Sequence, residues 1–97
     1  MEKRRLGNTG EEVTILGLGG FHLLEISDND AVSIINRYLD AGGNYIETAA
    51  QYGKGESERK VGLVAKKRRN DFFLTTKCHL RYKKGAEKCI NDSLQSI

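Results

Sequence analysis

Three side chains with complementary proton chemistry follow short apolar runs of this sequence. Glu47 ends one such run, Tyr52 lies five positions later, and Lys77 ends a second run thirty positions after Glu47. A carboxylate can hold a lysine charged and oriented, and an ammonium beside a tyrosine favours the phenolate form. Together the three groups could make the tyrosine a general acid near neutral pH. The plainer alternative is that the acid caps a loop, the tyrosine packs and the lysine faces solvent.

The two apolar runs are expected to be neighbouring strands of a parallel sheet. Residues 44–47 and 72–76 have strand character, and helical segments alternate with them along the chain. In parallel α/β folds, functional groups gather where the strands end, in the loops that lead to the helices. Neighbouring strands lie about 4.8 Å apart. We therefore expect Glu47 and Lys77 to pair directly, with Tyr52 on the loop above them.

Three helical segments are predicted from apolar side chains that recur at intervals of three and four residues. Ser27 suits the N-cap position of the first helix, and Gly42 suits the left-handed position that ends it. The predicted helices are 28–41, a second from about Glu56 to Arg69, and a third from Gly85 onward.

The first twenty residues predict a β-hairpin and then a glycine-rich strand end. Residues 3–6 and 12–15 flank the turn Gly7–Gly10, whose residues tolerate positive φ. Leu16–Gly20 carries three glycines, but His22 occupies the place of the third glycine of a dinucleotide fingerprint, which disfavours a Rossmann fold. The whole pattern is α/β: a hairpin followed by about three βα units, whose uncovered sheet edges favour self-association.

Composition limits the chain to one small domain, residues 1–97, with 38% hydrophobic and 30% charged residues. No apolar run is long enough for a membrane span and the N-terminus lacks a secretory signal, so a cytoplasmic location is expected. The basic clusters behind the net charge of +3 suit solvated helix ends better than nucleic-acid binding. Cys78 and Cys89 are too few for a metal site, and two buried thiols are favoured over a disulfide.

Several segments together resemble bacterial members of the aldo-keto reductase family, in the right order along essentially the whole chain. Within that family the sequence looks closest to the branch whose members can carry a C-terminal ferredoxin-like segment. The segments are Arg5–Gly10, Leu16–Gly20, Gly43–Ala49, Tyr52–Gly53, Ser57–Glu58 and Thr76–Lys77.

The resemblance implies part of a (β/α)8 TIM barrel that reduces small carbonyl substrates with NADPH. It implies that Tyr52 is the proton donor, that Lys77 is its partner and that Glu47 holds the position of the family's aspartate. The cofactor residues it implies lie at the nicotinamide end of NADPH, and they are Gly19, Gly20 and Phe21.

Two departures from the family pattern limit the expected activity. Glu47 is one methylene longer than the aspartate, and catalytic geometry is sensitive to shifts of about 1 Å. The family's catalytic histidine follows its fourth strand, and most cofactor-binding residues lie in the last third of the barrel, beyond the 97 residues here. We therefore expect a truncated domain that is inactive alone. The alternative is a non-catalytic module that oligomerises or docks on a partner.

Overall fold

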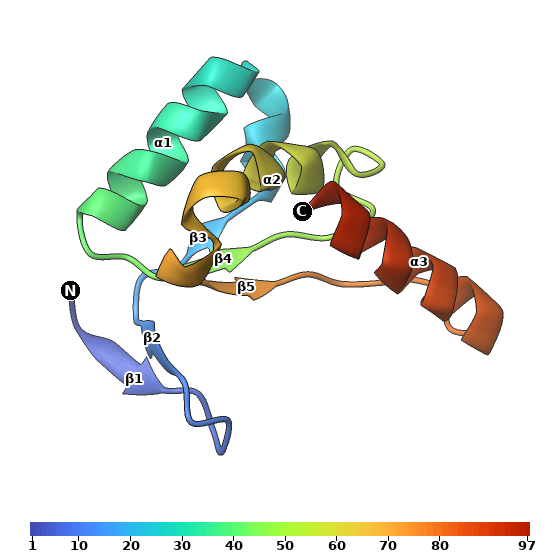
Figure 1. Cartoon of the computed structure of the whole chain (residues 1–97), viewed down its shortest axis with the longest axis horizontal. Helices are drawn as coiled ribbons and strands as arrows, with labels where there is room; N and C mark the ends of the chain where they lie inside the picture. Colours follow the sequence, from blue (N-terminus) through green and yellow to red (C-terminus); the bar gives the residue numbers. More distant parts are fainter.

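The computed structural model describes residues 1–97 as two small sheets and a set of helices (Figure 1). None of the helices combines the length and the apolar character that crossing a membrane requires. The elements are the strands β1 (Lys3–Arg5), β2 (Glu12–Thr14), β3 (Leu18–Gly19), β4 (Tyr45–Glu47) and β5 (Phe73–Thr75), the α-helices α1 (Asp28–Asp40), α2 (Glu56–Arg68) and α3 (Lys83–Ser96), and the 3-10 helices η1 (Phe21–Glu25) and η2 (Arg69–Asp71).

The larger sheet is parallel and has the order β3-β4-β5. Gly19 is paired with Glu47, and Glu47 is paired with Thr75. The ladder continues past the strands, since the amide of Ala50 donates to the carbonyl of Lys77 at 3.0 Å. The predicted parallel neighbours are thus confirmed, and both strands that carry the candidate groups end at the same edge.

The N-terminal hairpin is confirmed as an antiparallel pair, β1 with β2. Its turn contains Gly7 and Gly10, both with positive φ. Asn44 joins the hairpin to the parallel sheet, because its side chain accepts from the amide of Thr14 at 2.7 Å and donates to the carbonyl of Glu12 at 2.9 Å. The hairpin therefore lies at the amino ends of the parallel strands, away from the candidate groups.

A single hydroxyl group connects β2, β4 and the segment between β2 and β3 at that amino-terminal end. Tyr38, on α1, places its Oη 2.7 Å from the carbonyl oxygen of Leu16 and 3.0 Å from the hydroxyl of Thr14. The amide of Tyr45 also donates to this hydroxyl at 3.0 Å. The Tyr38 ring fills the space beside Gly43, where a Cβ would lie 2.2 Å from it.

The hydrophobic core lies between one face of the sheet and the helices α1 and α2 (Figure 1). Its fully buried side chains include Ile35, Ile46 and Val61. The opposite face of the sheet has no helix over it, and there the rings of Tyr45 and Phe73 stack with centroids 5.9 Å apart. Three parallel strands covered on one face form incomplete βα units rather than a closed barrel, as the sequence predicted.

Several local predictions are confirmed and others are wrong. Ser27 accepts from the amide of Asp30 at 3.1 Å as the N-cap of α1, and Gly42 has a φ of 99° just past its end. The residues of β5 are only half-buried, because helices cover one face of the sheet alone. Of the two expected buried thiols, Cys89 is buried and Cys78 is half-buried, since it lies beyond β5 at the rim of a groove.

The predicted helix bounds need small corrections. The helices α1 and α2 each end one residue earlier than predicted, and α3 begins at Lys83 rather than at Gly85. Lys83 and Lys84, which open α3, have ordinary helix propensity. The helix can therefore begin before Gly85.

Candidate functional site

Glu47, Tyr52 and Lys77 meet at the carboxyl ends of β4 and β5. The hydroxyl of Tyr52 donates to Oε2 of Glu47 at 2.9 Å, and the ammonium of Lys77 donates to the same oxygen. The Lys77 Nζ also donates to the carbonyl of Thr48 at 3.0 Å and lies 4.9 Å from the centroid of the Tyr52 ring. The expected pairing of acid, phenol and amine is therefore present.

The direction of the Tyr52 hydrogen bond distinguishes this arrangement from a simple lysine–tyrosine pair. The phenol proton is directed at the Glu47 carboxylate, while the ammonium lies beside the aromatic ring. An ionised carboxylate can only accept hydrogen bonds. The same carboxylate oxygen thus accepts the hydrogen bond of the phenol and pairs with the positively charged lysine.

Burial and pairing act in opposite directions on the two charged groups. Burial by itself would raise the pKa of Glu47, but the hydrogen bonds from Lys77 and Tyr52 outweigh it and hold that pKa below its ordinary value of 4.5. Burial by itself would lower the pKa of Lys77, but the contacts with Glu47 and Tyr52 together outweigh it and raise that pKa above 10.5. Both groups are therefore charged at neutral pH, as an ion pair at the strand ends.

A sharp loop between β4 and α2 brings Tyr52 back over the strand ends. The amide of Tyr52 donates to the carbonyl of Ala49 at 3.2 Å, which tightens the turn. Three residues then follow with positive φ, namely Gly53 at 63°, Lys54 at 53° and Gly55 at 95°. Glycine adopts this conformation without steric cost, which is why two of the three positions are glycine.

Buried hydroxyl groups hold the strand that precedes the loop, and the sequence reasoning assigned them no role. Thr48 and Ser57 have hydroxyl oxygens 2.7 Å apart, and Ser57 also donates to the carbonyl of Gly20 at 2.7 Å. Because the proton of Ser57 is used on Gly20, the Thr48 hydroxyl must be the donor of the pair. In the sequence Ser57 stands out only as part of the motif Ser57–Glu58, which indicates its position but not this contact.

The three predicted cofactor residues have different surroundings. A Cβ at Gly20 would lie 2.7 Å from both the carbonyl oxygen of Glu47 and the hydroxyl of Ser57, so only glycine fits there. A Cβ at Gly19 would meet nothing within 4 Å, so that backbone is open. The Phe21 ring is 51% exposed and meets the Tyr52 ring edge to face at 5.2 Å between centroids.

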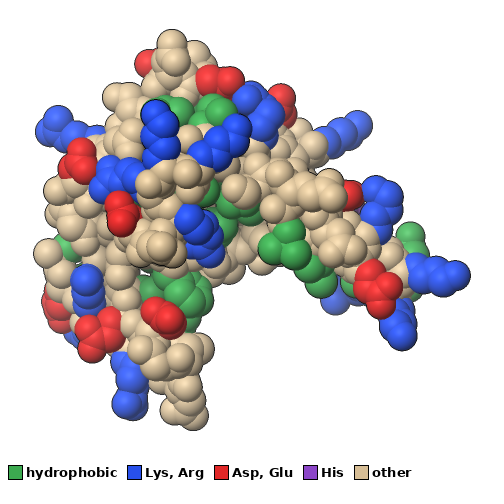
Figure 2. Space-filling view, viewed as in Figure 1, with side chains coloured by type: hydrophobic (Ala, Val, Ile, Leu, Met, Phe, Trp, Pro, Cys, Tyr) green, Lys and Arg blue, Asp and Glu red, His purple; other side chains and the backbone are tan.

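The basic residues do not form one continuous patch on the face that Figure 2 shows. There the Lys and Arg side chains are spread over several elements with acidic ones among them. Several make ion pairs, such as Arg59 with Asp28 at 2.8 Å and Arg68 with Asp40 at 2.9 Å. The absence of a nucleic-acid partner stays a prediction.

Comparison with known proteins gives one consistent family. The model of the aldo/keto reductase family matches residues 15–97. An uncharacterized oxidoreductase, YqkF of Bacillus subtilis (strain 168), is 37% identical over 90% of this chain and 28% of its own length. An L-galactose dehydrogenase of Arabidopsis thaliana is 32% identical, over 100% of this chain and 34% of its own length. The chain thus spans about a third or less of the length of these relatives.

Solved structures agree with the sequence comparison. The holo form of the aldo-keto reductase AKR11C1 from Bacillus halodurans superposes with a TM-score of 0.87 and 32% identity, over 99% of this chain and 36% of that one. An aldo-keto reductase from Klebsiella pneumoniae, solved in complex with NADPH, has a TM-score of 0.81 and 25% identity, over 88% of this chain and 31% of that one. The chain belongs to the aldo-keto reductase family.

Proposed function

We propose that residues 1–97 are a partial aldo-keto reductase domain that supplies the proton-donor part of a carbonyl-reducing site. The observation that carries this proposal is the contact of Tyr52 and Lys77 with one carboxylate oxygen of Glu47, at the carboxyl ends of neighbouring parallel strands. Membership of the family supports it, because aldo-keto reductases reduce carbonyl groups. The substrate is a small aldehyde or ketone, and the expected compartment remains the cytoplasm.

In this proposal Tyr52 gives its hydroxyl proton to the carbonyl oxygen of the substrate. The developing phenolate is stabilised by the Lys77 ammonium, which lies 4.9 Å from the centre of the same ring. Glu47 keeps the lysine charged and in place. In the arrangement described here the Tyr52 proton is engaged by Glu47, so this hydrogen bond must break before the proton can reach a substrate.

The cofactor of the proposal is NADPH, which is bound in the related Klebsiella pneumoniae structure. When bound, the nicotinamide supplies the hydride for the carbonyl carbon. Gly19 has open space where a side chain would lie, and the exposed Phe21 ring offers a flat apolar surface beside Tyr52. These features fit the nicotinamide end of the cofactor. Gly20 acts differently, since its missing side chain is what lets the strand approach Ser57.

Because the chain spans about a third of the relatives' length, we propose that it binds NADPH weakly and turns over no aldehyde by itself. Nicotinamide fluorescence and an NADPH-oxidation assay test this with the isolated chain. The proton-donor role is tested in a hybrid barrel in which this chain replaces the matching 36% of the Bacillus halodurans enzyme.

In that hybrid Tyr52→Phe should lower kcat by about 10²- to 10⁴-fold, because it removes the general acid while leaving the ring in place. NADPH affinity should stay unchanged, and circular dichroism checks that the hybrid folds. An unchanged kcat in a folded, NADPH-binding hybrid would refute the role of Tyr52.

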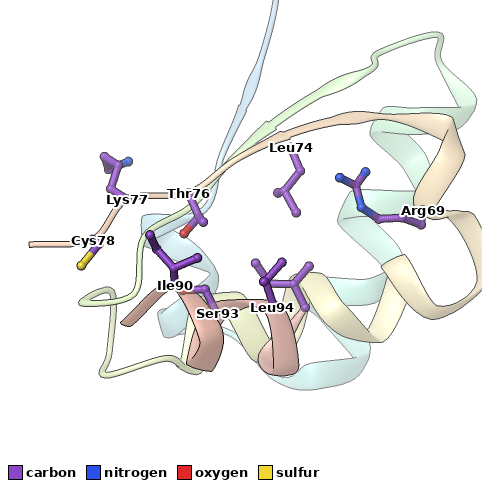
Figure 3. Close-up of a pocket in the computed structure, with 9 residues that line it drawn as sticks. Arg69, Leu74, Thr76, Lys77, Cys78, Ile90, Ser93 and Leu94 are labelled. Atoms are coloured by element: carbon purple, nitrogen blue, oxygen red, sulfur yellow. The ribbon is translucent and has the colours of Figure 1, made fainter. Parts of the chain in front are cut away.

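A second candidate function is a self-associating module, and an uncovered groove favours it. A groove of about 260 Å³ lies between β5 and α3, and Figure 3 shows Leu74 on one side with Ile90 and Leu94 on the other. Ile90 is 53% exposed and Leu94 is 75% exposed, although both are apolar. An open strand edge beside an apolar helix face is a surface on which another chain can add. In a solution of this chain alone, that partner is a second copy.

Sedimentation velocity over a concentration series tests self-association. A concentration-dependent dimer that Leu94→Lys weakens would support it, because the substitution places a charge in the apolar interface. Lys84→Glu serves as the control, because it changes a charge at the start of α3 and Lys84 does not line the groove. A monomer at every concentration would refute this second function and leave the first untouched.

A further inference from the structure

The two cysteines come from different elements and lie on facing segments beside the candidate site. Cys78 directly follows Lys77 on the segment that continues β5, and Cys89 lies on the buried face of α3 with 7% exposure. Alternate side chains of an extended segment point to the same side. Leu74, Thr76 and Cys78 accordingly line one groove, and Figure 3 shows α3 running along its other side.

Two neighbouring cavities show that the segment after Lys77 lies close to α3 near Cys89. The groove of about 260 Å³ contains Cys78 together with Ile90, the residue that follows Cys89. A second cleft, of about 520 Å³, contains Cys89 together with His79 and Leu80. Residues on both sides of each cysteine thus share a cavity wall with the other element.

The thiols also interact with each other. The neighbouring Cys78 thiol is the first of the causes that raise the pKa of Cys89, and burial and the nearby Glu58 carboxylate add to it. The Cys78 thiol itself donates to the carbonyl of Leu80 at 3.8 Å. Cys78 is the more accessible of the pair because it is half-buried, whereas Cys89 is buried. A reagent in solution can therefore reach Cys78 more readily than Cys89.

We propose that Cys78 and Cys89 form a reversible disulfide that fastens the segment after Lys77 to α3. The oxidant is a low-molecular-weight disulfide such as oxidised glutathione. The thiolate of Cys78 attacks it, forms a mixed disulfide and releases one glutathione thiol. The thiolate of Cys89 then attacks the Cys78 sulfur and releases the second glutathione thiol, so that two protein thiols are oxidised and one disulfide is reduced.

The order of the two steps follows from accessibility and protonation. Cys78 meets the reagent first, and Cys89 completes the bond from inside the fold. Because the pKa of Cys89 is raised, little of it is thiolate at neutral pH, and the second step should accelerate as the pH rises. Among the molecules that have reacted, the share that carries glutathione on Cys78 should therefore fall as the pH rises.

The experiment equilibrates the full chain in glutathione redox buffers and measures free thiols and intact mass. We expect loss of two hydrogens per monomer, with peptide mapping that joins residues 78 and 89. The effective concentration of the two thiols should be at least about tenfold higher in the native chain than in urea, because a disulfide that fits the fold favours the native state. By the same linkage, the oxidised chain should melt about 5 °C or more above the reduced chain.

Single-cysteine variants provide the controls. Cys89→Ser should keep a stable glutathione adduct on Cys78, and Cys78→Ser should react slowly because its remaining thiol is buried. Circular dichroism checks that each variant folds. Disulfide-linked dimers, adducts on both cysteines, or an effective concentration no higher in the native chain than in urea would each overturn the proposal.

Discussion

Replacing Glu47 by aspartate should release the Tyr52 proton and raise kcat in the hybrid enzyme. The substitution removes one methylene and withdraws the carboxylate by about 1.5 Å, the length of a C–C bond. The Tyr52 hydroxyl now lies 2.9 Å from the carboxylate, so the gap would grow to about 4 Å, too long for a hydrogen bond. The ammonium of Lys77, on a flexible stem, can follow the carboxylate and stay paired.

The size of the effect follows from the hydrogen bond that must break before proton donation. Hydrogen bonds to charged groups contribute about 1.5 to 3 kcal/mol. The Glu47 side chain is 31% exposed, so solvent competes for it and the low end of that range applies. About 1.4 kcal/mol corresponds to a tenfold change in rate. We therefore expect kcat to rise by about tenfold.

The assay measures kcat for aldehyde reduction by NADPH oxidation, with NADPH affinity as the check that the site is otherwise intact. Glu47→Gln is the matched control, because it keeps the length but loses the charge that holds Lys77. This control should lower kcat. If Glu47→Asp lowers kcat as much as the control does, the idea that the longer side chain restrains the Tyr52 proton is wrong.

Three further predictions concern the isolated chain. Ser57→Ala should lower the free energy of unfolding in urea by about 1 to 3 kcal/mol, because it leaves a buried hydroxyl and the Gly20 carbonyl unpaired, whereas the exposed Ser33→Ala should change it by less than about 0.5 kcal/mol. Gly20→Ala should cost about 1 to 3 kcal/mol in thermal unfolding and Gly19→Ala much less, since only the first would place a Cβ 2.7 Å from backbone; equal costs would contradict the packing argument. The pKa of Glu47 is lowered in the folded chain, so the stability that the ionised Glu47 contributes is complete above pH 4.5 and is lost as the pH falls through the folded pKa. The difference in Tm between Glu47→Gln and the native chain should therefore shrink in acid. A difference that stays constant with pH would refute this linkage.

Short-range signals in the sequence were sufficient to predict the scaffold of the site. Glycine positions, the Ser27 cap and the spacing of apolar residues each depend on local chemistry, and these gave the hairpin and the alternation of strand and helix. Parallel pairing then follows from alternation, which brings the ends of β4 and β5 together. The contact between Glu47 and Lys77 could therefore be predicted without coordinates.

Contacts that depend on side-chain direction and on the state of neighbouring strands could not be predicted in this way. Whether Tyr52 donates to Glu47 or bonds to Lys77 depends on one methylene and on a loop with three positive φ angles. The proximity of Cys78 and Cys89 depends on where α3 crosses the end of β5, which no periodicity encodes. The exposure of β5 likewise depends on what covers its second face, information that lies outside the strand itself.

The hydroxyl of Tyr38 has a consequence for how this fold can change over evolutionary time. It joins the chain at Thr14, Leu16 and Tyr45, so the alignment of the strands is fixed at their amino ends. The candidate groups Glu47, Tyr52 and Lys77 stand at the carboxyl ends and contribute nothing to that junction. Substitutions that alter the chemistry at the carboxyl ends of the strands thus leave intact the Tyr38 contacts that align the strands at their amino ends. An exchange such as aspartate for glutamate can accumulate there, and be reversed, while the strands keep their partners.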